Sequence, residues 1–419
     1  MKKINLLILL LISSALNAQN LSLSECINKT LNTHPDIKRF VLQVEQSKYG
    51  KDVAKADYLP QISLSAEYDP TRTYTISQNG AFSTKQEDGW QAGVVLNQKI
   101  WDFSKTTSAI KAAQKAEDIA KLSLKDAKAL LAYYVKLQYE LMVVQNEAIN
   151  VRKKDMRAKE ELYKQAKALV KQGIKTKADE SRFLSAFYNA KDNFSIAQAN
   201  FEKARINLSA YMGEDIDKNV KLDDAIISQN ILHVQSSMLY EMILKNNPQL
   251  LGIKESIIKN EFLYKEAKAS RYGSIDASLS YLHQDMLNEY DSSIVGITFK
   301  IPLYSGGRTT ALIQEAMIAK EISKKEYDSK RVALKQEFEQ LMTDFRRYDT
   351  TIESKKVQLQ ASIDARKLIE ARYKEGISTY IEVLDTISLY LDSQLGLIEA
   401  KYAKSSIINK IEYLQGKIK

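Results

Sequence analysis

An internal repeat constrains this chain more than any other feature. Residues 35–68 match residues 248–281 at a spacing of 213, and residues 93–213 match residues 296–416 at a spacing of 203. A chain that repeats itself in this way folds into two copies of one structural unit. The change in spacing falls in the polar stretch 69–89, which we expect to form a loop.

The composition favours long helices behind an export signal. The 419 residues are 44% hydrophobic and 27% charged, which excludes a chain that is disordered by composition. Five prolines and fourteen glycines are few for this length, and both residue types interrupt helices. In residues 1–18, Lys2 and Lys3 precede an apolar run, and small residues lead to a cleavage site after Ala18. This pattern predicts a secretory signal peptide and an exported mature protein.

Each repeat contains two segments in which polar and apolar residues alternate, which is the period of a β-strand. They predict β-hairpins at about residues 60–100 and 274–303. Each strand has about ten residues, the length that crosses a bilayer when the strand is tilted. Small polar residues dominate one face of the strands, and the other face carries Ile62, Leu64, Ala66, Tyr68, Ala92, Val94, Leu96, Ile275, Ala277, Leu279, Tyr281, Val295, Ile297 and Phe299.

Two interpretations of the hairpins compete. In a soluble sheet the apolar face would cover a core, but no amphipathic segment beside the hairpins could supply one, because both lead straight into very long helices. In a membrane sheet the apolar face contacts lipid and the polar face lines a lumen. Four strands cannot close a barrel, since the smallest barrels have about eight. We therefore expect the chain to oligomerise, with two copies giving eight strands and three giving twelve.

Each repeat also contains one very long helical stretch, at about residues 105–170 and 308–373. About 65 residues at 1.5 Å each make a helix of about 100 Å. Apolar residues of the first stretch follow the spacing of a coiled-coil seam, interrupted at Asp155 and Gln165, with a second apolar stripe beside it. A helix with two adjacent stripes has two neighbours, as in a cylinder of helices. If the two shorter helical stretches of each repeat stack end to end, three copies make twelve helices beneath twelve strands.

The expected fold is therefore mainly α with a small membrane β part: long coiled-coil helices in an α-helical barrel, four β-strands per chain and an internal two-fold repeat. The second hairpin should end in residues 301–304 and turn into its long helix at Ser305, Gly306 and Gly307, because glycine adopts turn conformations easily. The helices should turn back at tips 171–177 and 374–380.

These features together resemble the TolC family of outer-membrane efflux proteins over essentially the whole mature length. The resemblance rests on the two-fold repeat and its order, on the strand exit PLYSGGR (302–308), on YKEGISTYIEVLD (373–385) at a helical hairpin, and on glycines that end both repeats, Gly213 and Gly416. It divides the mature chain into a first repeat (19–213), a connector in an equatorial segment (214–235) and a second repeat (236–419).

The resemblance implies a homotrimer in the outer membrane of a Gram-negative bacterium. Its 12-strand β-barrel would contact outer-membrane lipid, and its 12-helix α-barrel would extend into the periplasm. It would conduct substrate passively from a periplasmic adaptor protein and an inner-membrane efflux pump or ABC exporter to the outside.

Several site residues follow from the resemblance. Four tip residues would dock the adaptor: Gly173, Ile174, Gly376 and Ile377. Glu382 and Asp385 match two acidic residues, one helical turn apart, that face the pore at its narrowest ring, and Tyr373 matches a gate tyrosine. Ser378 stands where relatives have a gate-closing arginine, so the closing contacts do not carry over.

Other function classes find little support in the sequence. Without Lys2 and Lys3 the net charge is +7, from 59 basic and 52 acidic side chains spread along the chain, which does not suggest nucleic-acid binding. The three histidines, His34, His233 and His283, lie far apart, without metal-ligand spacing and without a neighbouring nucleophile. We therefore expect no enzyme activity, no cofactor and no metal. The alternative that stays open is an exported coiled-coil scaffold, anchored in the outer membrane without a pore.

Overall fold

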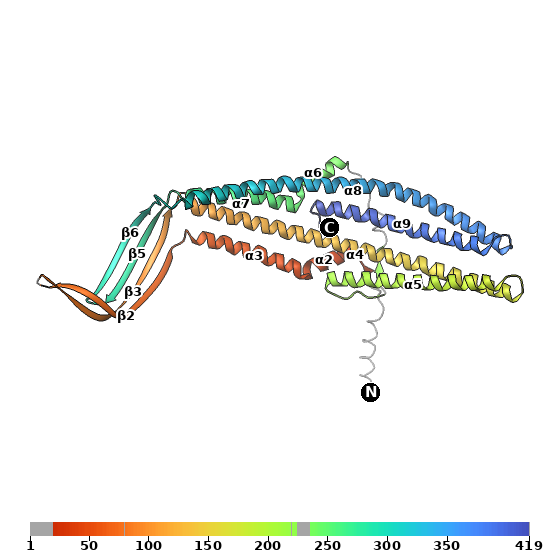
Figure 1. Cartoon of the computed structure of the whole chain (residues 1–419), viewed down its shortest axis with the longest axis horizontal. Coiled ribbons are helices and arrows are strands. Elements are labelled where there is room, and N and C mark those ends of the chain that lie inside the picture. The colour runs from red at the N-terminus through yellow and green to blue at the C-terminus, as the bar shows by residue number, and fades with distance from the viewer. Residues whose placement is uncertain (1–19, 79, 219, 224–234, 419) are drawn as a thin grey trace, which may run out of the picture. The chain divides into compact units, whose positions relative to one another are not determined.

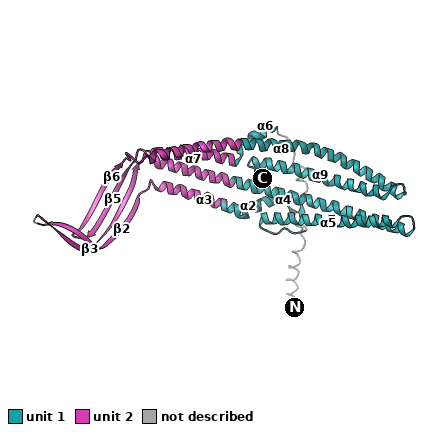
Figure 2. Ribbon diagram, viewed as in Figure 1, with its two compact units in different colours: residues 1–39, 125–248, 332–419 teal, residues 40–124, 249–331 magenta. Residues whose placement is uncertain are grey.

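The computed structural model describes residues 20–78, 80–218, 220–223 and 235–418. The predicted signal peptide, and most of the predicted connector, lie outside the described residues. The chain divides into two compact units, shown in Figure 2. We call residues 1–39, 125–248 and 332–419 the helical unit, and residues 40–124 and 249–331 the sheet unit.

The two halves of the chain carry the same elements in the same order (Figure 1). The first half contains α2 (Leu23–Thr33), α3 (Pro35–Ala56), β2 (Gln61–Gln78), β3 (Ala81–Trp101), α4 (Lys105–Lys171) and α5 (Lys177–Met212). The second contains α6 (Ser236–Asn246), α7 (Pro248–Ala269), β5 (Ser274–Asp285), β6 (Glu289–Lys300), α8 (Arg308–Lys374) and α9 (Tyr380–Leu414). Both long helices, α4 and α8, have 67 residues. The predicted mainly helical fold, with a four-stranded sheet and a two-fold repeat, is confirmed.

The sheet is antiparallel throughout, in the order β2-β3-β5-β6. The expectation of a loop at residues 69–89 was wrong. Both strands continue through this stretch, and Gln78 lies opposite Ala81. The β-branched and aromatic residues at 73–76 favour a strand despite their polar neighbours, and the Asn-Gly sequence at 79–80 favours a two-residue hairpin turn.

The second turn from sheet to long helix is built on glycine. Gly306 and Gly307 have φ of 61° and 83°, which L side chains rarely adopt. The Ser305 hydroxyl accepts the Thr309 N–H at 3.3 Å and so caps α8. The expected end of the strand was wrong, because β6 stops at Lys300 and residues 301–304 leave the sheet. Pro302 has no N–H to donate to a neighbouring strand.

The first half makes the same turn without glycine. Phe103 and Ser104 have φ of 53° and 70° at the positions that correspond to the two glycines. The buried Asp102 carboxylate accepts the Thr106 N–H at 2.8 Å and caps α4. Two non-glycine residues in the left-handed region cost free energy, which the cap and the packing around it must offset.

In the helical unit, α4 packs against α2 and α5 through one core cluster. Its buried α4 residues recur at the spacing of one helix face: Ala132, Val135, Tyr139, Met142 and Val143. They meet Cys26 and Ile27 from α2, and Ala204, Leu208 and Met212 from α5. Each large side chain buried in this way contributes about 1.5–3 kcal/mol to folding. None of the helices in the described part of the chain carries an apolar stretch that could span a membrane.

One hydroxyl joins two distant segments to this core. β1 (Asn20–Leu21) pairs in parallel with β4 (Lys221–Leu222). The Tyr139 hydroxyl donates to the Leu21 carbonyl at 2.7 Å and accepts the Asp223 N–H at 3.0 Å. The sequence does not predict this pair, because strands of two residues have no periodic pattern.

Candidate functional site

The two hairpin tips of the helical unit have the same backbone design. Gly173 and Gly376 have φ of 74° and 77°, and no heavy atom would lie within 4 Å of a Cβ at either position. The Ile174 N–H donates to the Leu169 carbonyl at 3.0 Å, which closes the end of α4. Ile174 and Ile377 are exposed. The predicted tip residues thus form tight turns, each with an exposed isoleucine next to a glycine that has open space around it.

A capping box follows each tip. The Glu382 carboxylate accepts the Thr379 N–H at 2.7 Å, and the Thr379 hydroxyl accepts the Glu382 N–H at 3.3 Å. Thr176 and Asp179 make the same pair in the first half. The backbone N–H of Thr379 lowers the pKa of Glu382, and the Thr379 hydroxyl adds to this effect. Glu382 therefore helps to cap the N-terminus of α9, a role that the Thr-x-x-Glu pattern could have predicted.

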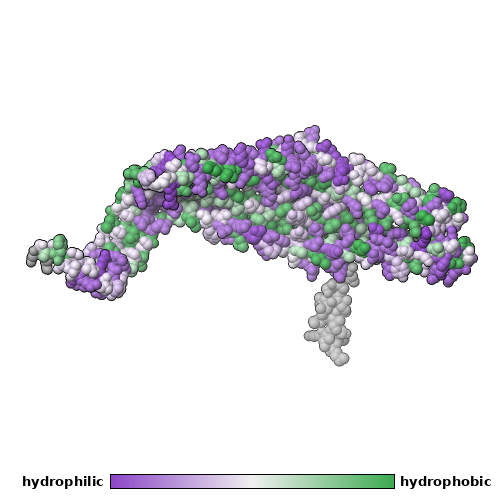
Figure 3. All heavy atoms as spheres, in the orientation of Figure 1, coloured by the Kyte–Doolittle hydropathy of each residue, from purple (hydrophilic) through white to green (hydrophobic). Residues whose placement is uncertain are grey.

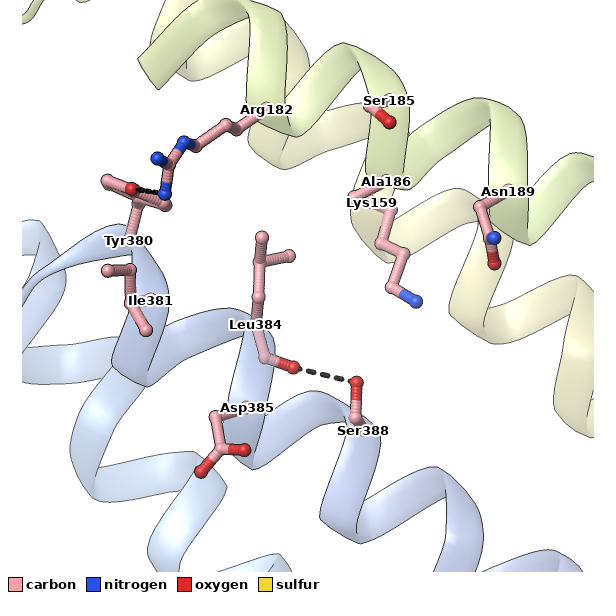
Figure 4. Close-up of a pocket in the computed structure, with 10 residues that line it drawn as sticks. All are labelled: Lys159, Arg182, Ser185, Ala186, Asn189, Tyr380, Ile381, Leu384, Asp385 and Ser388. Atoms are coloured by element: carbon pink, nitrogen blue, oxygen red, sulfur yellow. Dashed lines mark hydrogen bonds between the residues drawn. The ribbon is translucent and has the colours of Figure 1, made fainter. Parts of the chain in front are cut away.

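Asp385 lies one helical turn further on and lines a cavity of about 580 Å³ between α5 and α9 (Figure 4). The other lining residues are Lys159, Arg182, Ser185, Ala186, Asn189, Tyr380, Ile381, Leu384 and Ser388. The Asp385 carboxylate points away from the Lys159 side chain in Figure 4. Glu382 is not among the lining residues, so the structure does not bring the two predicted acids into one cavity of the chain.

Aromatic side chains tie the two hairpins together near their tips. Phe183 of α5 is fully buried and lies edge-on to Tyr373 at 6.0 Å and to Tyr380 at 6.1 Å between ring centroids. The Arg182 guanidinium lies over the Tyr380 ring at 4.9 Å and donates to its hydroxyl. The Lys175 ammonium lies 5.4 Å from the Tyr373 ring. We call these five residues the tip cluster.

Two buried hydroxyls, one in the tip cluster and one beside it, have no hydrogen-bond partner within the described ranges. They belong to Tyr373, which is 7% exposed, and to Ser378, which is 4% exposed. An unsatisfied buried hydroxyl costs about 1–3 kcal/mol. Burial raises the pKa of Tyr373, and the charge of Asp179 adds to the effect. The tip region therefore carries a local energetic cost, which the contacts of the tip cluster must offset.

The interruption of the coiled-coil seam at Asp155 is a buried ion pair. The Asp155 carboxylate lies 3.2 Å from the Lys159 ammonium one turn along α4, and both side chains are buried. Lys159 is also part of the cavity wall. The sequence shows that Asp155 interrupts the apolar pattern, but it does not show that Lys159 is its ion-pair partner.

The comparison with known proteins agrees with this geometry. A model of the family described as outer membrane efflux protein matches residues 26–214 and 239–416. The outer membrane protein TolC of Vibrio cholerae is 22% identical over 407 residues, which are 93% of this chain and 89% of that protein. The outer membrane efflux protein BepC of Brucella suis is 21% identical over 355 residues, 84% of this chain and 75% of that protein.

A solved structure shows the same fold. The crystal structure of the outer membrane protein VceC from Vibrio cholerae superposes with a TM-score of 0.80, at 15% identity, over 95% of this chain and 97% of that one. At this identity the likeness concerns the fold alone. The family model covers both repeats and most of the chain, and it agrees with the resemblance seen in the sequence. The chain therefore belongs to the family of outer membrane efflux proteins.

Proposed function

We propose that this outer-membrane efflux protein is the duct of a tripartite efflux or type I secretion system. As a member of its family it resides in the outer membrane of a Gram-negative bacterium and serves efflux. In the proposed system a periplasmic adaptor and an inner-membrane pump or ABC exporter supply the substrate and the energy. The duct itself conducts passively.

The observation that carries this proposal is the open sheet. β2 and β6 each have only one neighbouring strand in the part of the chain that is described, so both edges of the sheet are free. A sheet with two free edges and an exposed apolar face needs further strands. Three copies would close it into twelve strands, because β6 of one copy can pair with β2 of the next. The proposed assembly is therefore a homotrimer.

The acidic ring at the tip is the second part of the proposal. Three copies would bring six carboxylates together, three from Asp385 and three from Glu382. Both carboxylates attract cations into the constriction, and Glu382 does so from a position that its capping box holds in place. Tyr373 would act in the gate as a buried part of the tip cluster, and Arg182 would supply a closing contact where the sequence has Ser378 in place of an arginine.

The hairpin tips are the proposed adaptor-docking site. Gly173, Ile174, Gly376 and Ile377 offer, at each tip, an exposed isoleucine beside a glycine with open space around it. Three copies would present six such tips in a ring. An adaptor with helical hairpins of its own could pack against them end to end.

Native mass spectrometry of the detergent-extracted mature protein tests the assembly. A mass of three chains supports the duct, whereas a folded monomer would favour the scaffold without a pore. Planar-bilayer recordings then test conduction: Asp385→Asn should weaken the preference for cations, and Asp192→Asn, at an exposed position of α5, is the control. A trimer that conducts no ions would refute the duct and leave the scaffold.

A further inference from the structure

A carboxyl group is buried where the long helix of the first repeat meets the last helix of the second. Glu140 of α4 is 1% exposed. From α9, the Ser405 hydroxyl donates to its Oε1 atom at 2.8 Å, and the Asn409 side-chain amide donates to the same atom at 2.7 Å. Charged side chains normally lie at the surface, where Figure 3 shows hydrophilic residues over much of the helices. We call these three residues the carboxyl site.

The two oxygens of this carboxyl group differ in what they contact. Oε1 of Glu140 accepts both hydrogen bonds, whereas Oε2 is buried and has no hydrogen-bond partner in the part of the chain that the structure describes. A protonated carboxyl has this pattern, because one oxygen accepts and the other carries the proton. An ionised carboxylate spreads its charge over both oxygens and would leave one of them buried and unpaired. The hydrogen bonds therefore fit the neutral form better than the charged form.

The titratable groups that face the carboxyl site come from the same two helices. The Lys136 ammonium of α4 lies 2.6 Å from the Glu412 carboxylate of α9, so this cation already has an acidic partner. Burial raises the pKa of Tyr133 on α4 and of Tyr402 on α9 above 10.0, so both hydroxyls are neutral well below that pH. Burial also raises the pKa of Glu140, although the hydrogen bonds of the carboxyl site and the charge of Lys136 act against it.

The carboxyl site is not part of the repeated framework. At the spacing of 203, Thr343 of α8 corresponds to Glu140. Neither hydrogen-bond donor recurs in α5, which has Glu202 and Ile206 at the corresponding positions. Helix α8 is as long as α4 without a carboxyl group at this position. The helix itself therefore does not require Glu140, and a buried titratable group of this kind is a candidate for a function.

We propose that Glu140 makes the junction of α4 and α9 sensitive to pH. The neutral carboxyl accepts both hydrogen bonds and holds the two helices, one from each repeat, together. Loss of the proton leaves a buried charge, which water can solvate only if α4 and α9 separate. Acid therefore tightens the contact between the repeats, and alkali loosens it. The junction lies within one chain, so its response to pH does not depend on the proposed duct.

Proton linkage sets the direction of the effect. The ordinary pKa of the Glu140 carboxyl is 4.5, and its pKa in the fold is higher. Between these two values the folded chain keeps a proton that the unfolded chain has lost. The contribution of Glu140 to the free energy of unfolding is therefore greatest below pH 4.5 and falls as the pH rises to the folded pKa. Each pH unit in this window raises the ratio of open to closed junctions about tenfold.

Hydrogen exchange, measured by mass spectrometry on the detergent-solubilised full chain, tests the junction. Peptides from residues 400–414 of α9 are compared between the wild type and Glu140→Gln, which keeps an acceptor oxygen and carries no charge. Each comparison is made at one pH, so the pH dependence of the exchange chemistry cancels. Below pH 4.5 the two proteins should exchange at the same rate. At higher pH the wild type should exchange faster, by up to about tenfold per pH unit until the folded pKa is passed.

Two further variants separate a titrating carboxyl from one that only packs. Glu161→Gln, at a side chain that is 64% exposed on the same helix, should match the wild type at every pH. Ser405→Ala removes a donor that favours the charged form, so its exchange should stop rising with pH at a higher pH than in the wild type. The proposal is overturned if the ratio of the wild-type rate to the Glu140→Gln rate is the same at every pH. An unshifted profile in Ser405→Ala would overturn it as well.

Discussion

The contact between Arg182 and Tyr380 should hold the closed tip together, and its removal should open the channel. Arg182 is exposed, so its cation–π contact with Tyr380 contributes about 0.5–1 kcal/mol. The hydrogen bond to the Tyr380 hydroxyl adds about 0.5–1.5 kcal/mol. Together they stabilise the closed tip of one chain by about 1–2.5 kcal/mol. Since 1.4 kcal/mol is a factor of ten in an equilibrium, Arg182→Ala should raise the ratio of open to closed tips about tenfold per chain.

In the proposed trimer the effect is larger if the three tips open together. Three contacts are then lost in one step, and the ratio of open to closed channels rises by up to about a thousandfold. The assay is single-channel recording in planar bilayers. Tyr380→Phe keeps the ring and loses only the hydroxyl, so it should give an intermediate increase.

The matched control for this experiment is Lys191→Ala. The Lys191 ammonium lies 5.8 Å from the Tyr188 ring, but both residues belong to α5, so this contact joins no two helices. It should leave the open fraction unchanged. If Arg182→Ala gives the same open fraction as Lys191→Ala and the wild type, the contact does not hold the tip closed and the reasoning is refuted.

Three further predictions concern stability. The pKa of Glu382 is 4.5 in the unfolded chain and lower in the fold. The ionised carboxylate therefore stabilises the fold fully above pH 4.5, and this stabilisation is lost as the pH falls through the folded pKa. The melting temperature of Glu382→Gln should therefore lie below that of the wild type at neutral pH and approach it in acid; a difference that persists in acid would contradict this. Gly376→Ala, at φ of 77°, should lower the free energy of unfolding by about 1–2 kcal/mol. Gly50→Ala, inside α3 with open space around it, should raise it by about 0.5–1 kcal/mol. Denaturant unfolding measures both changes, and two changes of the same sign would contradict a backbone effect. Tyr139→Phe should cost about 1–3 kcal/mol because it removes two hydrogen bonds of about 0.5–1.5 kcal/mol each, and an unchanged free energy of unfolding in denaturant would argue against it.

The fold class could be predicted because it depends on periodic patterns. The repeat set two equal halves, alternation marked the strands, and the rarity of proline and glycine allowed helices as long as α4 and α8. The polar hairpin extension was mistaken for a loop because charge dominates its composition. Its β-branched residues and Asn-Gly turn carried the correct signal.

The site was less accessible from the sequence, because its contacts join residues far apart in the chain. Phe183 meets Tyr373 and Tyr380 only when α5 packs against the second hairpin, and no local spacing connects them. Nor could the sequence tell that the buried Glu140 carboxylate accepts hydrogen bonds from Ser405 at 2.8 Å and Asn409 at 2.7 Å. Burial raises the pKa of Glu140, in spite of these hydrogen bonds. The two acids of the tip, by contrast, are close in sequence, but Glu382 caps α9 whereas Asp385 lines the cavity.

The parallel pair of β1 and β4 has a consequence for the order of folding. Asn20 pairs with Lys221, so the pair closes a loop of about two hundred residues, and contacts at such a separation form late. The Tyr139 hydroxyl can form its hydrogen bonds with Leu21 and Asp223 only after both strands have packed against α4. We therefore expect these bonds to be absent from the folding transition state. In that case Tyr139→Phe speeds unfolding and leaves the folding rate unchanged. The pairing of the start of the first repeat with the connector then slows the unfolding of a core that has already formed.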